Sequence, residues 1–213
     1  MLDTLLKKKD IFATVLSFVF HPLLMPTIGV LIIFNSGSML SLVNLKAQLY
    51  VISLVFAFTC AIPALILPVF YYFRLTGNFQ ASERNERIFP VAITAVVYYL
   101  AYSFLKEQQL LVIIALFILT IDVILILLLV LNFFWKVSMH MAGIGGICGL
   151  TLFLSIQVSS INAWFFIIAL AAAGLIAHAR LRLQEHTPGQ IAGGFLLGLA
   201  PVFSMFIITT SLA

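Results

Sequence analysis

The sequence predicts an all-α integral membrane protein, and three observations carry this prediction. Apolar residues make up 63% of the 213 residues and charged residues only 8%, against about 45–50% and about 25% in soluble domains. Several apolar runs reach the roughly 20 helical residues that cross a bilayer core of about 30 Å. These runs are rich in Leu, Ile, Val and Phe without polar–apolar alternation, which favours helices over a membrane β-barrel.

We expect a single transmembrane helical domain over residues 1–213, built as a bundle of six to seven helices. No polar stretch is long enough to hold a separate soluble domain. A count of seven treats the third and fourth runs as separate helices. The seven predicted spans are 11–34, 47–73, 88–105, 110–134, 139–158, 163–179 and 188–212.

Prolines interrupt the first two spans. Pro22 and Pro26 lie inside the first, and Pro63 and Pro68 lie inside the second. Proline removes a backbone donor, so each pair predicts a kink of the kind that membrane helices tolerate.

The basic residues are distributed unevenly between the two ends of the predicted bundle. With seven spans, the N-terminus and the loops 74–87, 135–138 and 180–187 share one end, which carries nine of the eleven Lys and Arg residues. The positive-inside rule makes that end cytoplasmic. Cationic residues that bind a ligand are not topology signals, so the opposite orientation stays open. We expect a multi-pass protein of the cell membrane (the inner membrane in a bacterium) and no nucleic-acid partner for its net charge of +4.

Outside the N-terminal tail, the polar residues concentrate in the segments 82–87, 136–140 and 180–190. Two spans separate each segment from the next, and an even number of crossings returns the chain to the same end. We therefore expect basic residues and two histidines to converge at one mouth of the bundle.

The third segment predicts a helix start. Thr187-Pro188-Gly189-Gln190 has the pattern of an N-cap, a proline at the first helical position and a glutamine at the third, which is a capping box. His186 then lies just outside a helix N-terminus, where N–H groups favour an anion. Ser138 similarly caps the fifth span and places His140 in its first turn. Together with Arg side chains, this arrangement predicts a phosphate site.

These residues carry a resemblance to a known family. Arg180-x5-His186 followed by Thr-Pro-Gly-Gln resembles the third signature of the type-2 phosphatidic acid phosphatase superfamily, Ser-Arg-x5-His-x3-Asp. Ser138-Met139-His140 is similar to its second signature, Pro-Ser-Gly-His. Of the first signature, Lys-x6-Arg-Pro, only an Arg remains, at Arg84 or Arg87. The resemblance covers about 110 residues and implies the transmembrane core of that family.

The resemblance implies a phosphatase that hydrolyses lipid phosphates or pyrophosphates through a phosphohistidine. His186 would be the nucleophile and His140 the acid that protonates the leaving oxygen. The residues that would hold the phosphate oxygens are Arg180, Ser138, Arg87, Arg84 and Lys136. No metal or cofactor is implied, and the histidines lack the spacing typical of zinc sites.

Gln190 stands where the family has the Asp that orients the nucleophilic His. Its carbonyl can accept the imidazole N–H but cannot supply the negative charge that stabilises an imidazolium. In a Ser-His-Asp triad, the corresponding exchange of acid for amide lowers kcat by about 10⁴. This favours an alternative function, in which a catalytically impaired protein of the same fold binds a lipid phosphate or scaffolds a membrane complex.

Two further features leave other interpretations open. Asp122 lies in the middle of the fourth span, and an intramembrane carboxylate can mark a small transporter; His21, in the middle of the first span, is another candidate ligand. Small residues spaced four apart on the fifth and seventh spans predict close helix packing, which would bring His140 and His186 together. The same faces could support a homo-oligomer.

Overall fold

The computed structural model describes residues 11–72, 88–108, 111–158 and 163–211. In this part of the chain seven helical segments are long and apolar enough to cross a membrane, which confirms the predicted class and the higher count. The chain is a multi-pass membrane protein. The segments are Ile11–Phe34, Leu45–Ile66, Ile88–Lys106, Val112–Asn132, Met139–Gln157, Ala163–Arg182 and Pro188–Ser211.

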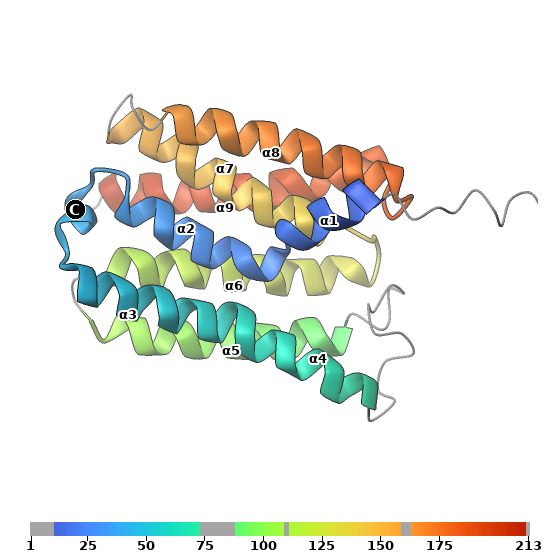
Figure 1. Cartoon of the computed structure of the whole chain (residues 1–213), viewed down its shortest axis with the longest axis horizontal. Helices are drawn as coiled ribbons and strands as arrows, with labels where there is room; N and C mark the ends of the chain where they lie inside the picture. The colour runs from blue at the N-terminus through green and yellow to red at the C-terminus, as the bar shows by residue number, and fades with distance from the viewer. Residues whose placement is uncertain (1–10, 73–87, 109–110, 159–162, 212–213) are drawn as a thin grey trace, which may run out of the picture.

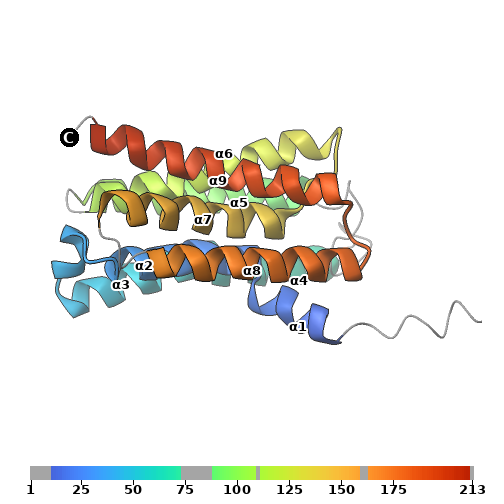
Figure 2. The ribbon, with the colours of Figure 1, turned by 90° about the horizontal axis from the view of Figure 1, so that it is seen from above.

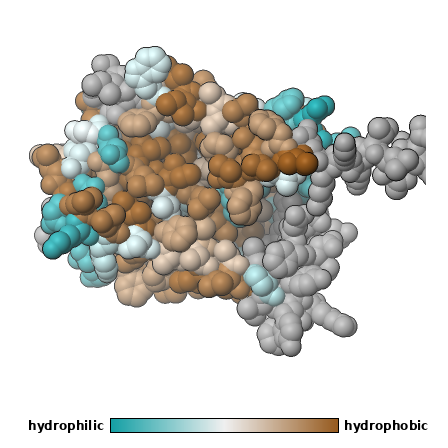
Figure 3. Space-filling view, in the orientation of Figure 1, coloured by the Kyte–Doolittle hydropathy of each residue, from teal (hydrophilic) through white to brown (hydrophobic). Residues whose placement is uncertain are grey.

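The helices run lengthwise beside one another, so the ends of the bundle collect the turns (Figure 1). The α6–α7 and α8–α9 turns lie at the end where α1 begins, as the seven-span topology predicts (Figure 1). On the face seen in Figure 3, hydrophobic side chains cover the middle and hydrophilic ones gather toward the ends. The last five helices are α5 (Ile88–Lys106), α6 (Val112–Asn132), α7 (Met139–Gln157), α8 (Ala163–Arg182) and α9 (Pro188–Ser211).

The first span is broken at Pro22. Helix α1 (Ile11–Val19) ends before it, a 3₁₀ turn η1 (Pro22–Leu24) follows, and α2 (Met25–Phe34) completes the crossing. Figure 2 shows α1 set off from the line of α2. The N–H of His21 bonds to the Phe18 carbonyl rather than continuing the α-helical pattern. The Ser17 carbonyl is therefore released from the helix and can accept a bond from elsewhere.

After the short turn η2 (Met39–Leu42), the second span also departs from a regular α-helix. Helix α3 (Leu45–Phe56) passes through a π-helical segment η3 (Ala57–Ala61) into α4 (Ile62–Tyr72). Pro63 has no N–H for the Thr59 carbonyl four residues earlier. The buried Tyr98 hydroxyl of α5 supplies the donor instead, at 2.9 Å. The predicted kink in the first span is confirmed by the break at Pro22. In the second span the departure is the π-helical segment before Pro63, and Pro68 lies inside α4. Each departure leaves a carbonyl that accepts a bond from a side chain of another helix.

Helices α7 and α9 pack with their backbones in close approach. A Cβ atom added to any of four glycines on these helices would collide with a carbonyl oxygen of the facing helix. The added atom at Gly194, for instance, would lie 2.5 Å from the Ser138 oxygen. The predicted role of the small-residue faces is thereby confirmed. The four glycines are Gly145, Gly149, Gly194 and Gly198.

Candidate functional site

A cavity of about 580 Å³ lies between the broken first span and helices α5–α8. On α6 its wall extends from Phe117 to Leu128, eleven residues apart, which corresponds to about 16 Å of helix. This wall is apolar. Toward the α8–α9 turn the lining becomes polar and includes His140, Arg180 and Glu185. The volume is typical of a small-molecule pocket, and the combination of an apolar wall with a cationic end suits an amphiphilic anion.

The capping box at the start of α9 fixes His186. The Thr187 N–H donates to Gln190 Oε1 at 3.1 Å, and the Gln190 N–H donates to Thr187 Oγ1 at 3.4 Å. The amide oxygen of Gln190 is thereby identified, because only an oxygen accepts from a backbone N–H. His186 Nδ1 lies 3.3 Å from the same oxygen, so Nδ1 carries a proton, and in the neutral ring Nε2 carries the lone pair. Gln190 is both a helix cap and the partner of His186.

Helix α7 begins at Ser138, as predicted. The buried Ser138 hydroxyl accepts from the Met141 N–H at 3.5 Å, and the Ser138 N–H donates to the Gln190 carbonyl at 3.3 Å. The first bond caps α7, and the second ties the start of α7 to the first turn of α9. The position of His140 relative to His186 therefore follows from the same backbone contacts that bring α7 and α9 together.

His140 is held by the break in the first span. Its Nε2 donates to the Ser17 carbonyl, the group that α1 releases, at 3.0 Å. The ring also meets His21 edge to face, with the ring centroids 5.7 Å apart. His21 in turn accepts the Leu23 N–H at Nδ1, which caps η1. Because Nε2 of His140 is a donor, a further proton on this ring would reside on Nδ1.

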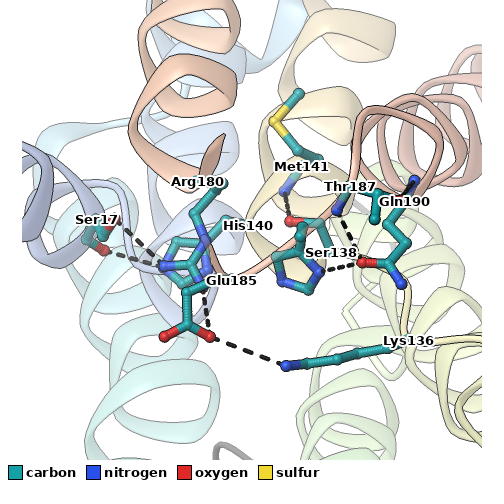
Figure 4. Close-up of polar contacts among 10 residues, drawn as sticks. Ser17, Lys136, Ser138, His140, Met141, Arg180, Glu185, Thr187 and Gln190 are labelled. Carbon is teal, nitrogen blue, oxygen red and sulfur yellow. Dashed lines mark hydrogen bonds and ion pairs between the residues drawn. The ribbon is translucent and has the colours of Figure 1, made fainter. Parts of the chain in front are cut away.

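Arg180 brings positive charge to the cavity from the last turn of α8. Its guanidinium donates to Ser17 Oγ at 3.4 Å through Nη1 and lies 3.8 Å from Glu185 Oε2 through Nη2. The same carboxylate oxygen lies 3.9 Å from Lys136 Nζ. Figure 4 shows the Glu185 carboxylate between the two cationic groups. The guanidinium is buried, as a charge that is paired can be.

The structure brings together three of the predicted site residues, His140, His186 and Arg180, as parts of one cavity lining. The other described ones do not belong to that lining but contact residues that do or fix the helices that carry them. Ser138 caps α7, Gln190 orients His186, and Lys136 contacts Glu185. Arg84 and Arg87 lie outside the described residues.

Two residues of the site, Ser17 and Glu185, were not among the predicted ones, and His21 was predicted only as a further candidate ligand. Ser17 joins His140 and Arg180, His21 packs on His140, and Glu185 bridges the cations. For His21 a signal existed, since an ionisable residue beside a proline inside a span is unusual. Ser17 offers no such signal, because its role comes from a carbonyl that the following proline releases.

Asp122 does not belong to this lining. It is buried near the middle of α6, and its Oδ1 atom has no hydrogen-bond partner among the described residues. His178 is exposed on α8 and is likewise outside the cavity.

Comparison with protein-family models, with curated proteins and with solved structures finds no match to this chain. The fold and the site define a helical multi-pass membrane protein with a cavity, whose polar end carries imidazole and guanidinium groups.

Proposed function

We propose that the protein is a membrane phosphatase that acts on lipid phosphates or pyrophosphates through a phosphohistidine intermediate. The observation that carries the proposal is the orientation of His186 by Gln190, which leaves the Nε2 lone pair on a ring that lines the same cavity as His140 and Arg180. The resemblance of the segment 180–190 to a lipid phosphatase signature adds support. The protein would reside in the cell membrane, the inner membrane in a bacterium.

The proposed reaction has two steps. Nε2 of His186 attacks phosphorus, and the bond from phosphorus to the lipid oxygen breaks. That oxygen takes a proton from Nδ1 of His140, which would have to bind this second proton when the anionic phosphate enters, and Arg180 stabilises the charge on the phosphoryl oxygens. A water molecule that gives a proton to His140 then attacks phosphorus, the nitrogen–phosphorus bond breaks, and phosphate leaves.

The cavity wall supports a lipid rather than a water-soluble phosphate ester. The α6 face between Phe117 and Leu128 contributes only apolar side chains to the lining. About 16 Å of apolar wall could contact roughly a dozen methylene groups, and each buried methylene contributes about 0.8 kcal/mol. A lipid phosphate would place its phosphate beside Arg180, at the cationic end of the cavity, and its alkyl or isoprenyl chain along the apolar wall of α6.

The test is phosphate release by the purified protein in detergent from phosphatidic acid and from an isoprenyl pyrophosphate. We expect release by the wild type and its loss in His186→Ala. His178→Ala is the matched control, because this histidine is exposed on α8 and outside the cavity. Release that persists in His186→Ala would exclude the proposed mechanism.

A second candidate function follows from Gln190. An amide cannot stabilise the imidazolium that accompanies phosphoryl transfer, so the site could bind a lipid phosphate with little turnover. Gln190→Glu separates the candidates, because it adds charge without shortening the side chain that reaches His186. Glutamate is also compatible with the capping box and with the helix N-terminus. For the enzyme, we expect kcat to rise by about tenfold or more; binding without turnover in both forms would favour the binder.

A further inference from the structure

Glu185 lies within ion-pair distance of two cations, Arg180 in the cavity lining and Lys136 beside it. One oxygen, Oε2, faces both Arg180 Nη2 at 3.8 Å and Lys136 Nζ at 3.9 Å. Figure 4 shows the carboxylate directed at both groups. The residue also lines the cavity, so its charge is exposed to whatever binds there.

The backbone holds Glu185 in this position through the turn that ends α8. The Gln184 N–H donates to the Leu181 carbonyl and the Glu185 N–H donates to the Arg180 carbonyl, the two bonds of a Schellman motif. Gln184 adopts a left-handed conformation, with φ of 54°. The turn reverses the chain, so Glu185 is brought back over the arginine five residues earlier.

The contact geometry is that of a loosely held counter-anion. Charge-assisted N–H···O bonds are about 2.7–2.9 Å long, and both distances here exceed that range. The Glu185 side chain is 35% exposed while that of Arg180 is 10% exposed. The Glu185 carboxylate contacts both cations through the same oxygen, so it does not give each cation an acceptor of its own. A phosphate presents three oxygens and up to two charges, so it can offer each cation its own acceptor.

We propose that Glu185 is an internal competitor that the phosphate of a ligand displaces from Arg180 and Lys136. This inference rests on the proposed function, because it concerns the anion that the same cavity binds. Glu185 thereby lowers the affinity for phosphate and makes the site specific for ligands with enough charge to displace a carboxylate. Singly charged phosphodiesters displace it poorly, and phosphomonoesters displace it well.

Equilibrium binding tests this inference without dependence on turnover. The probes are a dioctanoyl phosphonate analogue of phosphatidic acid, whose phosphorus–carbon bond resists hydrolysis, and inorganic phosphate, which has no chain. Glu185→Gln removes the competing charge and keeps the size of the side chain. We expect the dissociation constant of the phosphonate to fall by about fivefold to tenfold. A parallel fall for inorganic phosphate would assign the effect to the phosphate group alone.

Glu107→Gln is the matched control, because Glu107 pairs with Lys106 at 4.0 Å outside the cavity lining; we expect no change in binding. Wild-type binding that Glu185→Gln leaves equal or makes weaker would overturn this inference and leave the proposed function intact. No binding by wild type or variant would overturn both. If Glu185→Gln does not fold, Glu185→Asp draws the carboxylate away from both cations, and an unchanged dissociation constant would equally overturn the inference.

Discussion

The two sides of the bundle that meet at the site are built differently. On one side, α7 and α9 approach so closely that four glycines leave no room for a Cβ atom. On the other side, the first two spans are interrupted by prolines, and four prolines line the cavity. The four are Pro22, Pro26, Pro63 and Pro90.

The two sides therefore have different roles: one fixes the positions of side chains, and the other leaves space for a ligand. The α7–α9 side has backbone contacts that fix the caps at Ser138 and Thr187, and with them the positions of His140 and His186. The proline side leaves volume for a ligand, and its released carbonyls at Ser17 and Thr59 accept bonds from His140 and Tyr98. Close packing positions the reactive groups, and broken helices make the space in which they can act.

The largest effect should come from crowding the close-packed side. In Gly198→Ala the new methyl group would collide with the Ala142 carbonyl, a backbone atom that cannot move aside alone. We expect a loss of at least about 3 kcal/mol of stability, or no folded protein. Thermal unfolding in detergent, followed by size-exclusion chromatography, measures this change.

Gly174 provides the matched control for that substitution. It lies on α8, where an added Cβ would meet no side chain and no atom of another helix within 4 Å. We expect Gly174→Ala to be neutral or to stabilise the helix by up to about 1 kcal/mol. Equal effects at Gly198 and Gly174 would contradict the distinction between the two sides.

A smaller effect is expected on the proline side. Tyr98→Phe removes the hydroxyl that donates to the Thr59 carbonyl, and weakening a buried acceptor in this way should cost about 1–3 kcal/mol. Pro63→Ala restores a backbone N–H near that carbonyl. The double variant should therefore lose less stability than Tyr98→Phe alone, and strict additivity in a double-mutant cycle would exclude this explanation.

The smallest effect concerns the turn that carries Glu185. Gln184 is exposed and adopts a positive φ of 54°, a conformation that costs less for glycine. Gln184→Gly should stabilise the protein by about 0.5–1 kcal/mol. A loss of stability would mean that the Gln184 side chain, rather than the backbone, holds the turn.

Most of the architecture is predictable from the sequence because lipid imposes simple constraints. Span length, the break at Pro22 and the caps at Ser138 and Thr187 all follow from local patterns. The contacts of Ser17 and Tyr98 could not be predicted, because each joins a released carbonyl to a helix distant in sequence. The turn at Gln184 could not be predicted either, because it lacks the glycine that usually occupies a left-handed position at a helix end.

The central claim is that His186, oriented by Gln190, receives the phosphoryl group. The most direct measurement is ³¹P NMR of protein denatured in base during turnover of a lipid phosphate, with the modified residue located by peptide mass spectrometry. We predict an acid-labile phosphohistidine at His186 in the wild type and none in His186→Ala. Phosphate release without any phosphohistidine, or phosphate found on another residue, would contradict the claim.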